Sequence, residues 1–247
     1  ERGVCTHRSG NHAQAVAYSA QKRGIPAYIV MPNNSPDVKL NAVKGYGANV
    51  TLCEPTLEAR RTTLEGIAED TGAAVIHPFN NANVIAGQGT AALELIEDVG
   101  ELDAMIAPIG GGGLMSGTCI TTRSLLPDAK LFGAEPKGAD DAYRSLKEGK
   151  LLPQEDPKTI CDGLLTSMGE NTWNILKDHL DAIYTVSDED VVQSMRLIWE
   201  RMKIIIEPSC ATPVAVVMSS EFKQLENIEK VGIILTGGNV DLEKLPF

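Results

Sequence analysis

A run of four glycines, Gly110 to Gly113, is the feature that most restricts how this chain can fold. It follows an apolar segment at 104–109 and precedes small and apolar residues that begin at Leu114, which predicts a strand, a tight loop and a helix start. Glycines let backbone amides approach an anion closely, and a helix N-terminus adds unpaired N–H groups and the positive end of its dipole. The loop is therefore a candidate phosphate cradle, and a plain close-packed strand–helix turn is the alternative. It has neither the lysine of a P-loop nor the spacing of a Rossmann fingerprint.

Short apolar segments alternate with longer amphipathic ones along the chain. Strands are expected at 4–6, 27–31, 49–53, 74–76, 104–109, 131–135, 182–186 and 231–235. Helices are expected at 10–23, 36–46, 57–71, 84–97, 116–125, 188–202 and 214–225, whereas the polar segment 136–162 shows no strong periodicity. Strands separated by helices predict an α/β fold with parallel sheets covered on both faces. The Pro- and Asn-rich segment 77–83 predicts a boundary between a small α/β domain at 3–78 and a larger one at 79–247.

Composition excludes several classes of partner. The 247 residues carry a net charge of −11, which argues against nucleic acid because phosphate contacts need clustered Lys and Arg. No apolar stretch approaches the roughly 20 residues that a membrane helix needs. Five scattered cysteines without a C-x-x-C pair indicate reduced thiols and a cytoplasmic protein.

Three polar segments follow expected strands. The first contains Ser9, Asn11 and His12 at a strand-to-helix turn, a geometry that suits a carboxylate, although an ordinary N-cap is the alternative. The second is the acidic segment 135–141, which offers oxygen ligands for a hard cation such as Mg²⁺ or Ca²⁺ or forms a simple acidic loop. The third, 235–241, ends a strand with a hydroxyl and two glycines, where α/β folds place ligands, and a closing turn is its alternative.

Taken together, these motifs resemble the fold-type II pyridoxal 5′-phosphate (PLP) enzymes, in particular the serine racemase and serine/threonine dehydratase family, and most of all its eukaryotic racemase branch. The matching pieces keep their order along the chain: Ser9-Gly10-Asn11-His12, His77-Pro78-Phe79, Ala86-Gly87-Gln88-Gly89-Thr90, Gly110–Gly113, Glu135-Pro136 with Ala139-Asp140-Asp141, Glu207-Pro208-Ser209, and Thr236-Gly237-Gly238-Asn239-Val240-Asp241. An ordered set is specific, unlike any single motif.

The resemblance implies a two-domain fold of the tryptophan synthase β type, with three-layer αβα domains and PLP bound by the larger one. It implies interconversion of L- and D-serine, with side elimination of serine to pyruvate and ammonia. An L-threonine/L-serine ammonia-lyase is one alternative, and a catalytically inactive ligand-binding module is another. A β-replacement enzyme shares the fold but is disfavoured by the motifs at 135–141 and 237–241.

The resemblance also assigns roles to residues. Ser9 is expected to remove or return the Cα proton on one face of the substrate, while Ser9, Gly10, Asn11, His12 and Arg60 bind it. The expected cofactor-binding residues are Phe79, Gly110, Gly111, Gly112, Gly113, Leu114, Glu207, Thr236 and Asn239. Thr236 is expected to hydrogen-bond the pyridine nitrogen, where a racemase usually has Ser.

Further partners follow from the same resemblance. Glu135, the Ala139 carbonyl and Asp141 are expected to bind Mg²⁺ or Ca²⁺. Gln14, Lys39 and Tyr46 occupy positions that line an ATP effector site between subunits in the racemases. Family members are commonly dimers, so a homodimer acting on a small amino acid is expected.

Besides Thr236, the sequence departs from the family pattern in three places. The Schiff-base lysine of the family precedes the Ser-Gly-Asn-His loop, whereas no lysine precedes it here and Arg2 is the first basic residue, so we expect this chain to be an N-terminally incomplete piece of a longer enzyme. Arg8 stands where the family usually has Ser, beside the carboxylate clamp. Cys210 replaces a small residue, usually Ala or Gly, and a buried thiol is the expectation.

Overall fold

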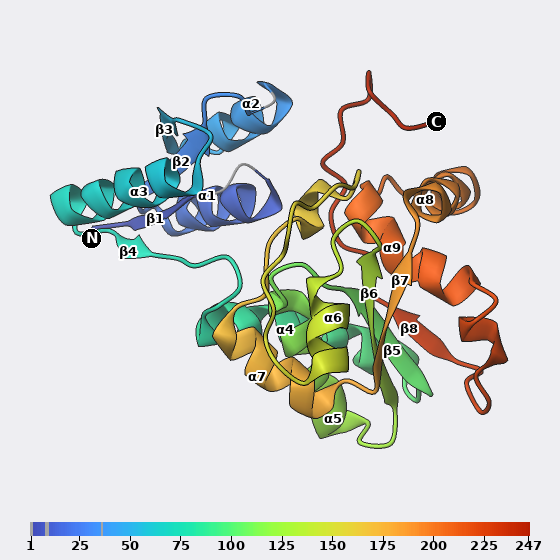
Figure 1. Ribbon diagram of the computed structural model, residues 1–247. Helices are drawn as coiled ribbons and strands as arrows, with labels where there is room; N and C mark the ends of the chain where they lie inside the picture. The colour runs from blue at the N-terminus through green and yellow to red at the C-terminus, as the bar shows by residue number, and fades with distance from the viewer. Residues whose placement is uncertain (1, 8–9, 36) are drawn as a thin grey trace. The chain divides into compact units, whose positions relative to one another are not determined.

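The computed structural model describes residues 2–7, 10–35 and 37–247 (Figure 1). The chain divides into two compact units, Glu1–Pro78 and Phe79–Phe247. Ser9 and Arg8, the expected base and its unusual neighbour, lie outside the described residues. Among the described helices, none is both long and apolar enough to cross a membrane.

The first unit contains a four-stranded sheet in the order β3-β2-β1-β4, and every neighbouring pair is parallel. Its strands are β1 (Val4–His7), β2 (Ala27–Pro32), β3 (Asn49–Cys53) and β4 (Ala74–Val75). Its helices are α1 (Asn11–Arg23), α2 (Asp37–Gly45) and α3 (Leu57–Thr71).

Alternating side chains of β2 separate two apolar layers in this unit. Ile29 and Met31 pack with the buried alanine face of α1. Val30, one residue along, packs with Leu64 of α3 on the other side. The period of two along the strand therefore places helices on both faces of the sheet.

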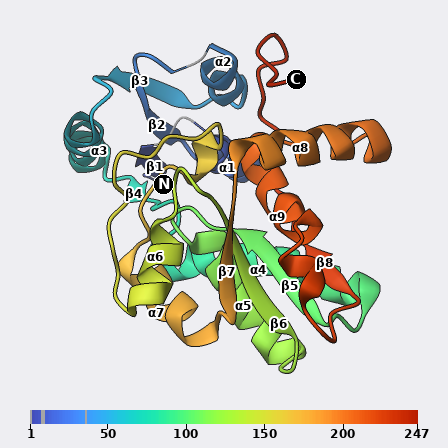
Figure 2. The same ribbon diagram turned by 45° about the vertical axis from the view of Figure 1, so that its right-hand side comes forward.

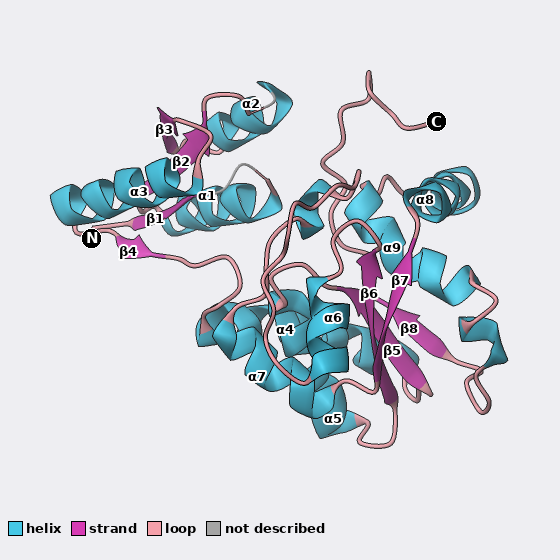
Figure 3. Ribbon diagram, viewed as in Figure 1, coloured by secondary structure: helices cyan, strands magenta, loops and turns pink. Residues whose placement is uncertain are grey.

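The second unit repeats this plan on a larger scale. Its parallel sheet has the order β7-β6-β5-β8, and Figure 3 shows the four strands with helices on both sides. The strands are β5 (Ala104–Pro108), β6 (Lys130–Pro136), β7 (Ala182–Val186) and β8 (Val231–Ile233). The helices are α4 (Ala82–Val99), α5 (Gly113–Leu125), α6 (Asp141–Glu148), α7 (Glu170–His179), α8 (Asp188–Met202) and α9 (Pro208–Met218), with 3-10 turns at Asp162–Leu164 and Phe222–Gln224.

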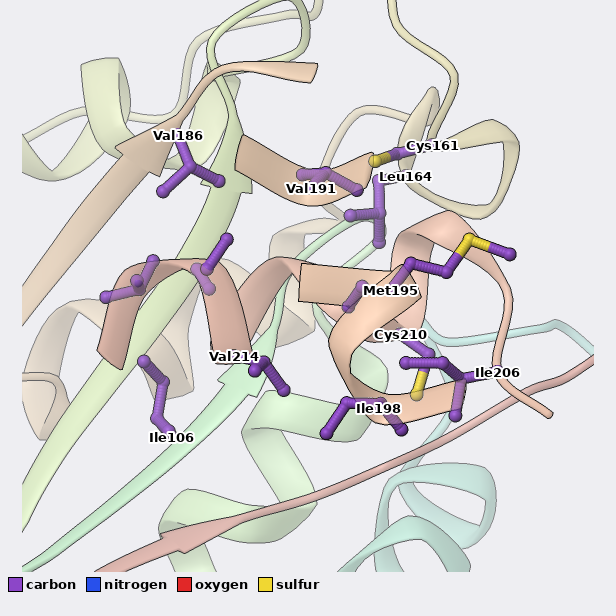
Figure 4. Close-up of a cluster of buried hydrophobic side chains, with 14 of the residues drawn as sticks. Ile106, Cys161, Leu164, Val186, Val191, Met195, Ile198, Ile206, Cys210 and Val214 are labelled. Atoms are coloured by element: carbon purple, nitrogen blue, oxygen red, sulfur yellow. The ribbon is translucent and has the colours of Figure 1, made fainter. Parts of the chain in front are cut away.

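Strand β5 shows how the two faces are filled. Ile106 joins the cluster made with α8 and α9, whose members include Met195, Ile198 and Val214 (Figure 4). Met105, its neighbour, joins the opposite cluster formed with α4, α5 and α7. All five residues of β5 are buried, which explains why the strand reads as a continuous apolar run. The expectation of parallel, three-layer α/β units is confirmed.

The structure of the second unit differs from the sequence-based expectation at three helices. The polar segment 136–162 contains α6, whose buried face includes Asp141 and Ser145 in place of large apolar side chains. Helix α7 was not expected from the sequence. The helix expected at 214–225 begins earlier, at Pro208, and ends at Met218, because a proline at the first helical position has a fixed φ that suits a helix start.

Candidate active site

Three motifs meet at the carboxyl edge of the second sheet. Strand β5 lies between β6 and β8, with Pro108 opposite Ala134 and Ile106 opposite Ile233. Because the strands are parallel, the glycine loop, Glu135 and the segment after β8 leave the sheet at the same edge. This edge is where open α/β sheets bind ligands.

The glycine loop is shaped by close contacts on two sides. A Cβ on Gly111 would lie 2.2 Å from the Phe79 ring, and one on Gly113 would lie 2.8 Å from the Phe79 Cβ. On the other side, a Cβ on Gly112 would lie 2.9 Å from the Thr172 Cβ, and Gly112 has a φ of +86°. The loop therefore requires glycine both for space and for backbone conformation.

The loop presents unpaired donors at the start of α5. No acceptor in the described part of the chain hydrogen-bonds the amides of Gly111, Gly112, Gly113 or Leu114, and no side chain caps the helix. By contrast, α4 begins with the Asn81 side chain accepting two amides. Free amides at a helix N-terminus fit an anionic group such as a phosphate.

The segment after β8 is held by the start of α9. The amide of Glu207 donates to the Gly237 carbonyl at 2.9 Å, and the Glu207 carboxylate accepts the Asn239 amide at 3.2 Å. The Thr236 amide donates to the Cys210 sulfur at 2.9 Å. Glu207 and Cys210 are buried, while Thr236 and Asn239 are exposed at the sheet edge. Two buried side chains thus fix the backbone of two accessible polar ones.

Glu135 and Asp141 are fully buried carboxylates. Glu135 accepts the amides of Ala142 and Tyr143 at 3.1 and 2.7 Å, and Asp141 accepts the Met168 amide at 3.0 Å. Burial, followed by the charge of Asp141, raises the pKa of Glu135 well above its usual range. Burial also raises the pKa of Asp141 to about 6. Two desolvated carboxylates that repel each other are suited to a nearby cation.

A cation at this point would need backbone oxygen as well. The described residues contain no group of three or more His, Cys, Asp or Glu side chains arranged to hold a metal. The expected set of Glu135, Asp141 and the Ala139 carbonyl has only two such side chains. Oxygen ligands of this kind suit Mg²⁺ or Ca²⁺ better than a transition metal.

Three of the expected substrate-binding residues, Gly10, Asn11 and His12, lie at the start of α1. Gly10 precedes this helix, Asn11 is its first residue, and neither the cap nor the first turn is acidic. The His12 Nε2 lies 3.1 Å from the Ile76 carbonyl, which also accepts the Thr6 hydroxyl at 2.8 Å. Because a carbonyl only accepts, Nε2 carries the proton. A contact of His12 with a carboxylate can therefore use the backbone amide, or Nδ1 if this nitrogen is protonated as well.

The remaining expected residues of the first unit lie on its helices. Arg60, on α3, donates from Nε to the Thr56 carbonyl at 3.3 Å. Tyr46 follows α2 and packs edge-on against Tyr18 of α1, with 5.4 Å between ring centroids. Gln14 lies on α1 and Lys39 on α2. The Gln14 Nε2 is buried without a hydrogen-bond partner among the described residues.

Two residues near the start of α7 were not expected from the sequence, and one of them contacts the glycine loop. Thr172 donates its hydroxyl to the Gly111 carbonyl at 2.8 Å. Asn80 accepts the Asn171 amide at 2.9 Å and so holds the start of α7. The signal was present for Asn80, since it follows the His77-Pro78-Phe79 motif, but Thr172 lies in a helix that was not expected.

Comparison with known proteins identifies the family of the chain. The model of the pyridoxal-phosphate dependent enzyme family matches residues 1–237, and the chain belongs to this family. It is 53% identical over 246 residues to a serine racemase of Dictyostelium discoideum, covering 99% of this chain and 76% of that protein. It is 47% identical over 246 residues to a beta-hydroxyaspartate dehydratase of Paracoccus denitrificans, covering 100% of this chain and 78% of that protein.

A solved structure gives the same result for the fold. The structure of maize serine racemase superposes with a TM-score of 0.96 at 43% identity, covering 98% of this chain and 75% of that one. The expectation of a fold-type II enzyme of the serine racemase and dehydratase group is confirmed.

Proposed function

We propose that the protein is a PLP-dependent serine racemase that interconverts L- and D-serine, with elimination of serine to pyruvate and ammonia as a side reaction. The observation that carries this proposal is the row of unpaired amides from Gly111 to Leu114, at the sheet edge that Thr236 shares. The 53% identity to a racemase supports the choice of reaction.

The second unit fits the cofactor. The amides of Gly111 to Leu114 would hold its phosphate, and Phe79 and Asn239 would contact its ring. Thr236 would hydrogen-bond the pyridine nitrogen. Glu207 holds the segment 236–239 through the Asn239 amide and the Gly237 carbonyl. PLP, when bound, supplies an electron sink for negative charge at the substrate Cα. A neutral hydroxyl such as that of Thr236 moderates this sink, which suits mixed racemisation and elimination.

The first unit binds the substrate and moves the proton. The amides and side chains of Gly10, Asn11 and His12 hold the substrate carboxylate, because a helix N-terminus favours a negative group. Arg60 supplies a positive charge on the same unit. Ser9 removes or returns the Cα proton on one face, so that racemisation depends on its hydroxyl.

We also propose a divalent cation and an effector. Glu135, Asp141 and the Ala139 carbonyl bind Mg²⁺ or Ca²⁺, supported by the mutual repulsion of the two buried carboxylates. Gln14, Lys39 and Tyr46 contact ATP in a homodimer, supported by the unsatisfied Gln14 amide. Five free cysteines support a reducing, cytoplasmic location.

A dehydratase is the second candidate. It is supported by the 47% identity to a beta-hydroxyaspartate dehydratase. Elimination and racemisation both begin with loss of the Cα proton, so the same site serves either. The two candidates differ in the product that leaves.

The test is product analysis with the full protein, PLP and L-serine. Chiral chromatography measures D-serine, and a coupled assay measures pyruvate. Racemase activity predicts D-serine formation that falls at least about a hundredfold in Ser9→Ala, since general acid–base groups contribute factors of this size. Ser19→Ala, an exposed serine on α1, is the matched control. Pyruvate without D-serine would support the dehydratase, and neither product would overturn both.

A further inference from the structure

Thr172 lies directly behind the glycine loop. It is in the first turn of α7, which packs against α5 (Figures 1 and 2). Its side chain is completely buried. The Thr172 Cβ would be 2.9 Å from a Cβ on Gly112, so the two residues touch.

The Thr172 hydroxyl donates its proton to the Gly111 carbonyl. The hydroxyl oxygen lies 2.8 Å from the Gly111 oxygen and 3.0 Å from the Gly169 oxygen, and it accepts the Gly169 amide at 3.0 Å. The Gly169 oxygen already accepts the Trp173 amide at 2.8 Å. A hydroxyl has one proton, and the Gly111 oxygen has no other donor in the described part of the chain. The hydroxyl therefore donates to the Gly111 oxygen, which is the nearer of the two acceptors.

This bond sets the direction of an amide. The Gly111 carbonyl and the Gly112 N–H belong to one planar trans peptide, so they point in opposite directions. When Thr172 holds the carbonyl toward α7, the N–H must point away from α7. Gly112 has no side chain to resist rotation of this peptide, so an external bond is needed to fix it.

We propose that Thr172 is a positioning residue for phosphate binding, which orients the Gly112 amide by holding the Gly111 carbonyl. The proposal rests on the proposed function, because it takes the glycine loop to be the phosphate cradle. Its ligand class is the phosphate monoester of a pyridoxal compound. Thr172 itself does not touch the ligand.

The test compares PLP with pyridoxal, which lacks the phosphate. Dissociation constants of both are measured by fluorescence titration of the full protein and of Thr172→Val, which keeps the shape but removes the hydroxyl. We expect PLP affinity to fall about five- to tenfold, the effect of one hydrogen bond, and pyridoxal affinity to stay within twofold. Thr172→Ser restores the hydroxyl and is expected to restore PLP affinity. The phosphorus NMR shift of bound PLP is expected to move in Thr172→Val alone.

A matched control separates positioning from general loosening. Thr118 is also a fully buried threonine, and its hydroxyl has no partner in the described part of the chain. Thr118→Val is expected to leave the preference for PLP over pyridoxal unchanged. If Thr172→Val does not fold, Thr172→Cys, a weaker donor of similar size, is measured in its place.

The outcomes are distinct. A preference for PLP that survives in the Thr172 variants would overturn the role of Thr172 and leave the cradle intact. Equal affinity of the unaltered protein for PLP and pyridoxal would overturn the cradle itself, and the role of Thr172 with it.

Discussion

The sulfur of Cys210 accepts the Thr236 amide, with 2.9 Å between nitrogen and sulfur. Cys210 is fully buried beside Ile206 and Met195, as Figure 4 shows. A thiol in the core therefore holds the backbone of the residue that we place at the pyridine nitrogen.

Cys210→Ala leaves the Thr236 amide without its acceptor. We expect the free energy of unfolding to fall by about 0.5–1.5 kcal/mol, the net contribution of one typical hydrogen bond. The visible absorption maximum of bound PLP is expected to shift, because the Thr236 backbone, and with it the side chain at the pyridine nitrogen, is no longer held. Urea unfolding and a spectrum measure the two effects.

The controls for Cys210 are a conservative and a distant variant. Cys210→Ser keeps an acceptor and is expected to keep the spectrum. Cys119→Ala removes an equally buried thiol from α5 and is expected to change stability without a spectral shift. A shift of the same size in Cys119→Ala would contradict the role of Cys210.

Gly112→Ala tests the glycine loop directly. The residue has a φ of +86° and touches Thr172. We expect the free energy of unfolding to fall by roughly 2–4 kcal/mol, from the left-handed conformation and from overpacking together. Thermal or urea unfolding measures this loss, and PLP binding is expected to weaken with it.

Gly87→Ala is the matched control for Gly112. Gly87 lies inside α4, and an added Cβ there meets nothing within 4 Å. Alanine is the better helix former, so we expect a gain of roughly 0.5–1 kcal/mol. A loss at Gly87 equal to that at Gly112 would show that the effect is not specific to the loop.

Asp181 makes stability depend on pH. Its carboxylate pairs with Arg123 at 2.7 Å and Lys130 at 3.0 Å, and it accepts the Leu131 amide at 2.8 Å. Burial alone would raise the pKa of Asp181, but these hydrogen bonds outweigh it, so the pKa is lowered. The stability from the charged form is present above the unfolded pKa of about 3.9 and is lost as the pH falls through the folded pKa.

Asp181→Asn therefore has a pH-dependent effect. We expect a loss of about 1–2 kcal/mol at pH 7, since the group is partly exposed. The difference from the unaltered protein is expected to shrink below about pH 4 as Asp181 itself is protonated. Urea titrations of both proteins at pH 7 and below about pH 4 measure this difference in the free energy of unfolding. A difference that is independent of pH would rule out the charge of Asp181 as its cause.

Mg²⁺ or Ca²⁺ is expected to raise the melting temperature. A ligand at a hundred times its dissociation constant stabilises the folded state by about 2.7 kcal/mol. Asp141→Asn is expected to abolish this increase. Asp140→Asn, which loses the ion pair with Arg144 at 2.9 Å, is expected to retain it. Equal increases in both variants, measured by calorimetry, would place the cation elsewhere.

Much of the fold could be predicted because parallel strands buried on both faces read as unbroken apolar runs, as β5 does. The failures have physical causes. Helix α9 is buried on nearly all sides, from Ser209 to Val216, so it lacks the polar face that gives helical periodicity. Pro213 inside it resembles a helix breaker. Helix α6 is short and packs through Asp141 and Ser145, whose hydroxyl donates to the Asp141 carbonyl.

Part of the site could likewise be predicted from the sequence, and part could not. Gly110 to Gly113 could be located from the sequence because four consecutive glycines after an apolar run form a local pattern. Thr172 could not be located, since its role depends on how α7 meets a loop 61 residues earlier. Ordinary residues that act through tertiary contacts carry no local signal.

The order of strands in the second sheet affects how the protein folds during synthesis. Strand β5 lies between β6 and β8, and β8 follows every other described strand along the sequence. About 120 residues separate β5 from β8. At a synthesis rate of 5–20 residues per second, one edge of β5 therefore stays unpaired for roughly 6–25 seconds before β8 is made. A fully apolar strand with an open edge is a template for aggregation. The newly made chain is therefore expected to need a chaperone while it is still on the ribosome.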